Sequence, residues 1–187
     1  MSIIDTNGYS YAWYMRPLLA LMSRRRSGLS EPVRLWARQP MAFLGFLLMN
    51  LALDHRNPSL SKTLRALVRT RVSQLNGCRF CIDLNAAHAL DCGLSREKLE
   101  ALAWFSDSSL YSDAEKVALA YAETVTTIGN VADASLIEQL RHTFDDDDIV
   151  ALTALIAHQN MSAKFNAALG ASPQGLCMTH YGYFPSD

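Results

Sequence analysis

The sequence predicts an all-α protein, and three observations support this prediction. Apolar residues recur at helical spacing in almost every segment, and almost no segment shows the alternation of a strand. Capping residues stand where most of these periodic segments begin. The 187 residues, of which 50% are hydrophobic and 19% charged, suit one domain with a sizeable core. We therefore expect a single helical domain over residues 1–187.

The expected helices follow one another with short connectors. Pro32 suits the first turn of a helix over residues 30–39, and Pro40 suits the start of an apolar helix over residues 41–53. Most later helices begin after a Ser or Asp that can cap the first turn, and Ser112 with Glu115 forms a capping box. After a connector at residues 55–58, helices are expected at residues 62–75, 78–91, 95–104, 116–127, 133–142 and 149–169. We expect the final segment, 170–187, to be irregular.

Two charge clusters have ordinary structural interpretations. The acidic run at residues 145–148 precedes a helix, where negative charge stabilises the N-terminus, and a divalent-metal site would need more oxygen ligands at defined spacing. The arginine run at residues 24–26 is flanked by serines and predicts a solvated turn, with an anion or subunit contact as the minor alternative.

Charge and hydropathy argue against two classes of partner. The net charge of −1 and the pI near 6.5 provide no basic field for nucleic acid or an anionic membrane. The longest apolar run, residues 41–53, is interrupted by Asn50 and is too short to cross a bilayer. No secretory signal pattern begins the chain, so we expect a cytoplasmic protein. Because structural disulfides are rare there, a C-x-x-C pair indicates redox or metal chemistry.

Such a pair is the most informative motif of the chain. Asn76 and Gly77 end one helix, so Cys78 falls in the first turn of the next helix and Cys81 follows three residues later. Unpaired N–H groups and the helix dipole favour a thiolate there, which lowers the thiol pKa and makes the thiol reactive. Residues at spacings of three and four extend this stripe along the helix: Cys78, Cys81, Asn85, His88 and Cys92.

Metal binding is the weaker interpretation of the cysteines. A structural zinc site needs four ligands, commonly as a second cysteine pair or a histidine pair, and the chain offers only the scattered Cys92, Cys177 and five histidines. We expect Cys92 and Cys177 to be core residues and expect no metal. His158 is a weaker candidate for a polar pocket group. Aromatic residues are interpreted as packing, so no cofactor is expected: Trp36, Phe43, Phe46, Trp104 and Phe105.

Three segments resemble one family. The stretch from Val72 to Leu84, with its cysteine pair, is similar to the core motif of the carboxymuconolactone decarboxylase and alkylhydroperoxidase D superfamily, and residues 115–123 and 154–169 extend the similarity. The resemblance covers roughly residues 60–175. It implies an all-helical subunit that forms symmetric oligomers (dimers, trimers or hexamers) around a pocket near the dithiol. Members with the cysteine pair resemble thiol peroxidases acting on organic hydroperoxides, whereas the lactone decarboxylases generally lack it.

The chain departs from the peroxidase pattern at two positions. The family's histidine, four residues after the second cysteine, is replaced by Asn85, and its glutamate, a dozen residues before the first cysteine, is replaced by Ala66. That pair forms the family's proton relay. An amide can donate to a thiolate but cannot take its proton, whereas His88 can. His88 lies about 10.5 Å of helix rise beyond Cys81, so it would need a bridging water or a neighbouring subunit.

The leading hypothesis is a thiol peroxidase or dithiol oxidoreductase, with catalytic candidates Cys78, Cys81, Asn85 and His88. The family resemblance implies that Cys81 attacks, helix position favours Cys78, and a separate dithiol (lipoyl-type or thioredoxin-like) reduces the disulfide. Two alternatives remain. One is a lactone-acid decarboxylase that needs an arginine or a base in its pocket; the other is a non-catalytic oligomeric binding protein.

Aromatic residues favour assembly into a homo-oligomer. Trp13, Trp36 and Trp104, with seven Tyr and seven Phe, are more than one short bundle readily buries. We expect residues 1–28 and the tail at residues 170–187, which includes Tyr181, Tyr183 and Phe184, to be peripheral or to lie between subunits.

Overall fold

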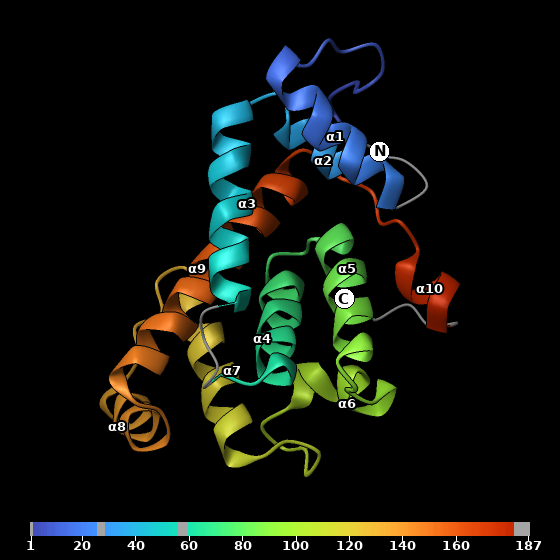
Figure 1. Cartoon of the computed structure of the whole chain (residues 1–187). Helices are drawn as coiled ribbons and strands as arrows, with labels where there is room; N and C mark the ends of the chain where they lie inside the picture. Colours follow the sequence, from blue (N-terminus) through green and yellow to red (C-terminus); the bar gives the residue numbers. More distant parts are fainter. Residues whose placement is uncertain (1, 26–28, 56–59, 182–187) are drawn as a thin grey trace.

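The all-α prediction is confirmed by a computed structural model, which describes residues 2–25, 29–55 and 60–181 (Figure 1). Within these ranges the chain forms helices and no strand. The two short 3-10 helices are η1 (Trp13–Met15) and η2 (Ala101–Trp104). The α-helices are α1 (Arg16–Arg25), α2 (Glu31–Trp36), α3 (Pro40–His55), α4 (Lys62–Leu75), α5 (Arg79–Asp91), α6 (Arg96–Glu100), α7 (Asp113–Thr126), α8 (Ala134–Thr143), α9 (Asp146–Ala168) and α10 (Leu176–Tyr181).

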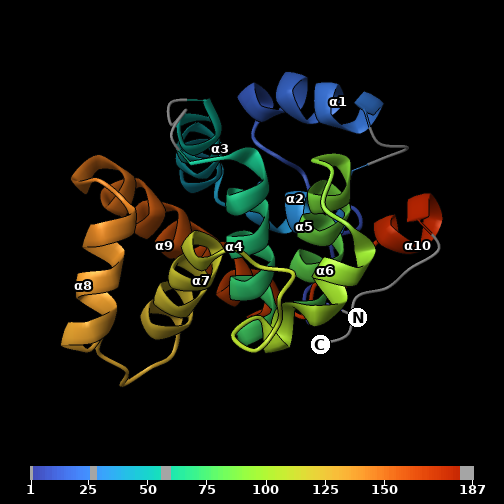
Figure 2. The same ribbon diagram turned by 90° about the horizontal axis from the view of Figure 1, so that it is seen from below.

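Helix α4 is the centre of the fold and packs against α5, α7 and α9 (Figure 2). It is buried almost all round, including Leu67, Val68 and Val72. These side chains form the main core with residues such as Leu119 of α7 and Ile156 of α9. Because α4 ends directly before the cysteine pair, the core fixes where the dithiol lies.

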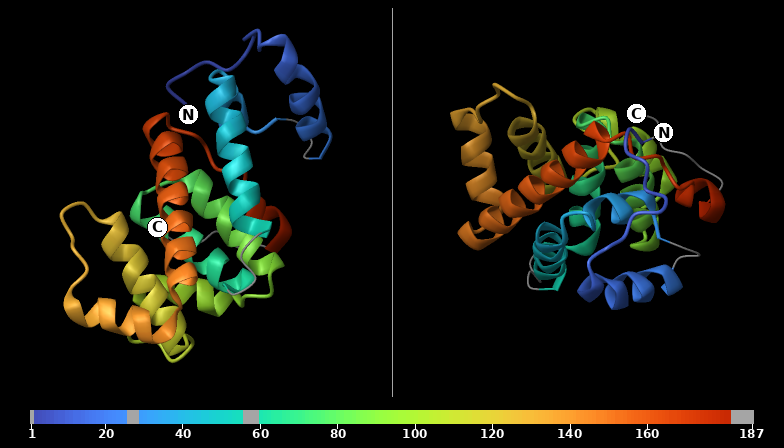
Figure 3. Two further views of the ribbon diagram at one scale, coloured as in Figure 1. Left: turned by 60° about the vertical axis from the view of Figure 1, so that its left-hand side comes forward. Right: turned by 90° about the horizontal axis from the view of Figure 1, so that it is seen from above.

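The first three helices form a layer against the end of this bundle. Helix α3 packs on α9, and α2 packs on α3 (Figure 3). Trp36 of α2 stacks on Phe165 of α9 with ring centroids 3.9 Å apart and on Phe46 of α3 at 4.9 Å. The layer therefore has an aromatic inner face beside the N-terminal half of α5 and the C-terminal half of α9.

The predicted caps are confirmed. Ser61, Ser95 and Asp133 each accept a hydrogen bond from a backbone N–H in the first turn of the following helix. Ser112 and Glu115 form the expected capping box. In the acidic run at residues 145–148, Asp145 Oδ1 accepts from the backbone N–H of Asp148 at 2.8 Å, as its interpretation as a helix start requires.

Two expectations about the ends of the chain are corrected. Residues 176–181 form α10, so the expectation that the whole segment from residue 170 is irregular is wrong. The buried carboxylate of Asp83 in α5 accepts hydrogen bonds from the backbone N–H groups of Gln174, Leu176 and Cys177. A residue of another helix therefore caps the start of α10. At the other end, α1 was not predicted. Arg24 and Arg25 of the arginine run lie in its last turn, so the turn predicted there is wrong. Arg26 lies outside the described residues, as do residues 56–58 of the predicted connector and Tyr183 and Phe184 of the tail.

Across the described ranges, no helix has both the length and the apolar character needed to cross a bilayer.

Candidate functional site

The two cysteines lie at the turn between α4 and α5. Gly77 adopts a φ of 59°, a left-handed conformation that favours glycine and ends α4 sharply. Cys78 is the N-cap of α5 rather than a residue of its first turn, and its Sγ accepts the backbone N–H of Cys81 at 3.3 Å. The structure joins Cys78 and Cys81 in a disulfide with their Cα atoms 5.2 Å apart. The turn therefore brings the two thiols within bonding reach.

Both sulfurs lie inside the protein. Cys78 is 1% exposed and Cys81 2%, and they pack with Phe80 and Ala163 in a small cluster of their own. A reactant that reaches either sulfur must enter through a cavity, because neither cysteine is at the surface.

Two adjoining cavities meet at this cluster. The smaller, about 150 Å³, is lined by Cys81 and by the polar side chains of Asn85, Arg69, His158 and Gln159. The larger, about 330 Å³, is mostly apolar and lies under the α1–α3 layer. Four residues line both: Phe46, Phe80, Leu84 and Ser162. A ligand with an apolar body and one polar end would fit this arrangement.

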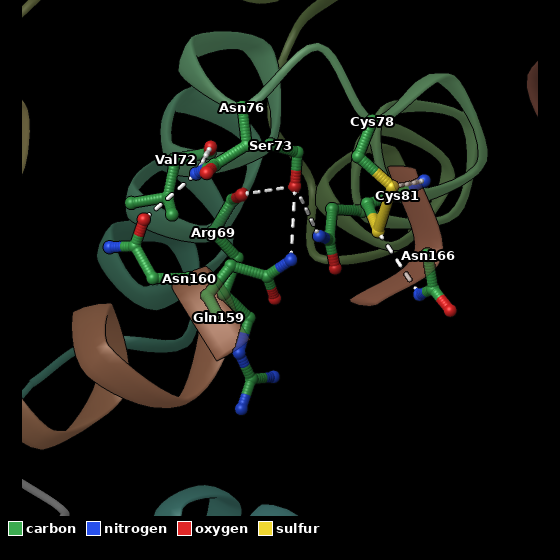
Figure 4. Close-up of a disulfide and its surroundings, with 10 residues drawn as sticks. Arg69, Val72, Ser73, Asn76, Cys78, Cys81, Gln159, Asn160 and Asn166 are labelled. Atoms are coloured by element: carbon green, nitrogen blue, oxygen red, sulfur yellow. Dashed lines mark hydrogen bonds between the residues drawn. A yellow bond between two sulfur atoms is a disulfide. The ribbon is translucent and has the colours of Figure 1, made fainter. Parts of the chain in front are cut away.

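A hydroxyl-centred network forms the polar wall (Figure 4). Ser73 Oγ accepts from Asn85 Nδ2 at 2.9 Å and from Gln159 Nε2 at 3.1 Å, and it donates to the Arg69 carbonyl at 2.7 Å. Asn85 is buried one helical turn after Cys81, but its hydrogen bond goes to Ser73 rather than to a sulfur. The network orients amide groups, and none of these three side chains is a base at neutral pH.

One residue in contact with the disulfide was missed by the sequence analysis. Asn166 of α9 donates from Nδ2 to Cys81 Sγ at 3.4 Å (Figure 4). It lies eight residues after His158 and four after Ser162, so the three share one face of α9. That helical period was the only available signal, and it does not indicate which helix the face meets.

The charged and titratable groups of the polar cavity are also buried. Arg69 forms an ion pair with Asp54 at 2.9 Å, and burial lowers the pKa of Arg69 while Asp54 opposes that effect. His158 lies 3.3 Å from the carbonyl of Phe46 through Nε2 and stacks on the Phe46 ring. Burial lowers the pKa of His158, which favours the neutral imidazole.

The predicted stripe along α5 divides into two parts. Cys78, Cys81 and Asn85 face the interior, whereas His88 is exposed and its Nε2 lies 3.6 Å from Cys92 Sγ. Within this subunit His88 lines neither cavity at the disulfide, so its catalytic role stays a prediction that requires another subunit. Ala66, at the family's glutamate position, is buried in the main core.

The other two cysteines differ from each other. Cys177 is buried as predicted, donates to the Asp83 carbonyl at 3.4 Å, and has its pKa raised to about 11, chiefly by burial. Cys92 is not a core residue: it is the C-cap of α5 and partly exposed. Among the described residues, no group of three or more His, Cys, Asp or Glu side chains is placed to hold a metal ion.

Comparisons with known proteins agree with these features. The carboxymuconolactone decarboxylase family matches residues 41–124. The uncharacterized protein YnjA of Escherichia coli (strain K12) is 35% identical over 163 residues, which cover 87% of this chain and 90% of YnjA. In fold, the chain is similar to an uncharacterized peroxidase-related protein from Silicibacter sp. TM1040, with a TM-score of 0.81, 19% identity, and coverage of 98% of this chain and 95% of that one.

A further structure of similar fold carries a ligand. It is a cysteine variant of the debrominase Bmp8 in complex with 2,3,4-tribromopyrrole, with a TM-score of 0.79, 19% identity, and coverage of 96% of this chain and 97% of that one. The sequence match to YnjA, the family match and the shared helical fold together assign the chain. It belongs to the carboxymuconolactone decarboxylase and alkylhydroperoxidase D superfamily.

Proposed function

We propose that this protein is a cytoplasmic thiol peroxidase that reduces organic hydroperoxides. The observation that carries the proposal is the Cys78–Cys81 disulfide, buried where Cys81 lines a polar cavity that adjoins a larger apolar one. A hydroperoxide has an apolar body, which suits the larger cavity, and a polar reactive end, which suits the polar cavity beside Cys81.

The proposed reaction has two thiol steps. The Cys81 thiolate attacks the terminal oxygen of the hydroperoxide, the O–O bond breaks, and the alcohol leaves after taking a proton from water. The sulfur then carries the terminal oxygen as a sulfenic acid. The Cys78 thiol attacks that sulfur, the disulfide forms, and the hydroxyl leaves as water with the thiol proton.

The two roles are assigned by access to the cavity. Cys81 lines the polar cavity, and Cys78 lines neither of the two cavities described above. Cys78 is the N-cap of α5 and its Sγ accepts the backbone N–H of Cys81, a contact that favours the thiolate form of a resolving thiol. We therefore give Cys81 the attack and Cys78 the resolving step.

Burial also bears on the reductant. A dithiol must bring one of its sulfurs into line with the disulfide, and both cysteines are enclosed. A slender lipoyl-type dithiol can enter a cavity, whereas the surface thiols of a folded thioredoxin-like protein require the site to open first. The proposed donor is therefore lipoyl-type.

Counting free thiols tests the proposal. The fully reduced protein, treated with a small excess of cumene hydroperoxide, should lose two thiols per chain, and a lipoyl-type dithiol should restore them. A decarboxylase or a non-catalytic binding protein would lose none. The decarboxylase alternative has its arginine, Arg69, in the polar cavity, but the ion pair with Asp54 already neutralises that guanidinium.

Reductive removal of a halogen from a small aromatic compound is the second candidate. The larger cavity is lined by Trp36, Phe43, Phe46 and Phe80, which favour a flat apolar ligand. The dithiol would supply two electrons, the ring carbon would take a proton, and halide would leave as the disulfide forms. Bromide release from a bromopyrrole, measured beside the thiol count, separates this activity from hydroperoxide reduction.

Restoring the family relay should accelerate the peroxidase. We expect Asn85→His combined with Ala66→Glu to raise the rate at neutral pH, because the wild-type site lacks the family's proton relay that draws the proton from the attacking thiol. The wild-type rate should rise towards alkaline pH and that of the variant should rise earlier. The measurement is the pH profile of the second-order rate constant with cumene hydroperoxide.

The variant should also unfold more easily, because Ala66 lies in the main core. An unchanged profile in a folded variant would show that the site has been rebuilt for other chemistry.

An exposed apolar surface on α3 is the proposed contact between subunits. Helix α3 exposes an apolar stripe at Met41, Leu44, Leu48 and Leu51, at helical spacing. Trp13 and Tyr14 are also exposed, as is Trp104, whose predicted packing within the subunit is wrong. We expect Leu48→Glu to lower the oligomeric mass in light scattering, because a charge would be buried between subunits. Val131→Glu, also at an exposed apolar residue, is the control. A wild-type monomer at micromolar concentration would contradict the assembly prediction.

A further inference from the structure

Asn166 has a hydrogen-bonding group to which the described residues give no partner. Its side chain is 3% exposed, and Oδ1 is buried with no hydrogen bond from the described residues. A buried polar atom without a hydrogen bond destabilises the fold, so the presence of this one calls for a functional explanation. The same amide donates to Cys81 Sγ, and Asn166 lines the apolar cavity.

We propose that Asn166 is a catalytic residue that holds the hydroperoxide at Cys81, an inference that rests on the proposed function. Its Nδ2–H stabilises the Cys81 thiolate, and its Oδ1 accepts the hydrogen of the substrate's terminal O–H. The substrate supplies the partner that the described residues do not provide for Oδ1.

The orientation of the amide follows from the chemistry of the sulfur. A thiolate accepts hydrogen bonds and donates none, so the amide must present its nitrogen to Cys81. Oδ1 then points away from the disulfide, as Figure 4 shows. This donor also compensates for Asn85, whose amide is engaged with Ser73.

The position of Oδ1 suits the oxygen that must react. Cys81 Sγ lies 3.4 Å from Asn166 Nδ2, and Oδ1 is bonded to the same side-chain carbon as Nδ2. The sulfur and Oδ1 are therefore close to each other. A single oxygen atom can therefore lie about 3–3.5 Å from the sulfur, as a near-attack geometry requires, and about 2.8 Å from Oδ1. In a hydroperoxide that oxygen carries the hydrogen, and it is also the atom that the thiolate attacks.

The electron and proton balance of this step is complete. The S–O bond forms as the O–O bond breaks, sulfur loses two electrons, and the peroxide gains them. The hydrogen held by Oδ1 stays on the transferred oxygen as the sulfenic O–H. The departing alkoxide takes its proton from water, for which the polar cavity of about 150 Å³ has room.

The inference defines a substrate class. The ligand must carry an O–H on its terminal oxygen and an uncharged apolar body that occupies the cavity lined by Trp36, Phe43 and Val33. A dialkyl peroxide, which has no such hydrogen, should be a poor substrate even when it has the same body.

The test compares two thiol reagents in a Cys78→Ser background, in which Cys81 alone reacts at the site. Cumene hydroperoxide carries the donor hydrogen, and methyl methanethiosulfonate does not. Rates are followed at the Cys81 peptide by rapid quench and mass spectrometry, on the plateau of each pH profile, where the thiolate fraction cancels. The variants are Asn166→Leu, which removes both amide groups, and Asn166→Asp, which keeps the size and an acceptor oxygen.

We expect Asn166→Leu to lower the hydroperoxide rate about tenfold more than the thiosulfonate rate, the loss of one substrate hydrogen bond. The midpoint of its pH profile should move to higher pH because the thiolate loses its donor. Asn166→Asp should shift the midpoint further but retain a wild-type ratio of the two plateau rates. Asn160→Ala, in the same helix but bonded to Asn76 and Thr126, is the matched control and should change neither.

The outcomes separate this inference from the proposed function. A wild-type protein that does not react with cumene hydroperoxide would overturn both. If wild type reacts but both reagents slow equally in Asn166→Leu, the inference is wrong and the peroxidase proposal stands. Thermal unfolding of each variant shows whether it is folded. If Asn166→Leu is not folded, the pH midpoint and the rate ratio of Asn166→Asp test the inference instead.

Discussion

Cys81→Ser will abolish turnover of organic hydroperoxides, by about 10³-fold or more, because the substitution removes the nucleophile. A serine hydroxyl cannot form the thiolate or the sulfenic acid. The measurement is steady-state consumption of cumene hydroperoxide with a lipoyl-type dithiol as reductant. The fold should be unaffected, since the oxygen fits where the sulfur lies and the main core is a separate cluster.

Cys78→Ser should behave differently, and the contrast assigns the two roles. This variant should react with one equivalent of hydroperoxide and stop, because the sulfenic acid on Cys81 has no resolving thiol, and dimedone should trap it. Cys92→Ser is the control and should turn over normally, because Cys92 lies at the far end of α5. If Cys81→Ser instead formed the trapped species, Cys78 would be the attacking residue.

Asp83→Ala will destabilise the protein by about 3 kcal/mol or more, because it leaves three backbone donors without their acceptor. Asp83 is fully buried, and its two oxygens accept the N–H groups of Gln174, Leu176 and Cys177 at 2.9–3.0 Å. Removing an acceptor from a buried donor costs about 1–3 kcal/mol each, reduced where the tail can detach and reach water. Urea unfolding measures the free-energy change.

The control for this variant is Asp107→Ala at an exposed position, which should change stability by less than about 0.5 kcal/mol. Amide exchange should accelerate at Gln174, Leu176 and Cys177 in the Asp83 variant, because these N–H groups lose their hydrogen bonds. Wild-type stability with wild-type exchange would show that the carboxylate does not hold the tail.

The helices that were predicted are those whose starts are encoded locally. Ser61, Ser112 and Asp133 cap the helices that directly follow them, so the signal and the structure are neighbours in sequence. Helix α10 has no such signal, because its cap is Asp83, which lies more than ninety residues earlier. Helix α1 likewise begins without an acidic first turn, directly after a 3-10 helix.

The same distinction applies to the site. The cysteine pair and the end of the preceding helix at Gly77 are local features, and they predicted the dithiol. Asn166 and Gln159 come from α9, and their place at the disulfide depends on how α9 packs against α4 and α5. The helical spacing predicted for the stripe along α5 was correct. It could not show that packing covers only its first half and leaves His88 exposed.

The most direct test of the dithiol account is a mass map of the protein after one equivalent of cumene hydroperoxide. Starting from fully reduced protein, the account predicts a loss of two hydrogens per chain and a single new cross-link between Cys78 and Cys81, which a dithiol reverses. A cross-link to Cys92 or Cys177 would contradict it, as would reduction of the hydroperoxide while Cys78 and Cys81 both stay free.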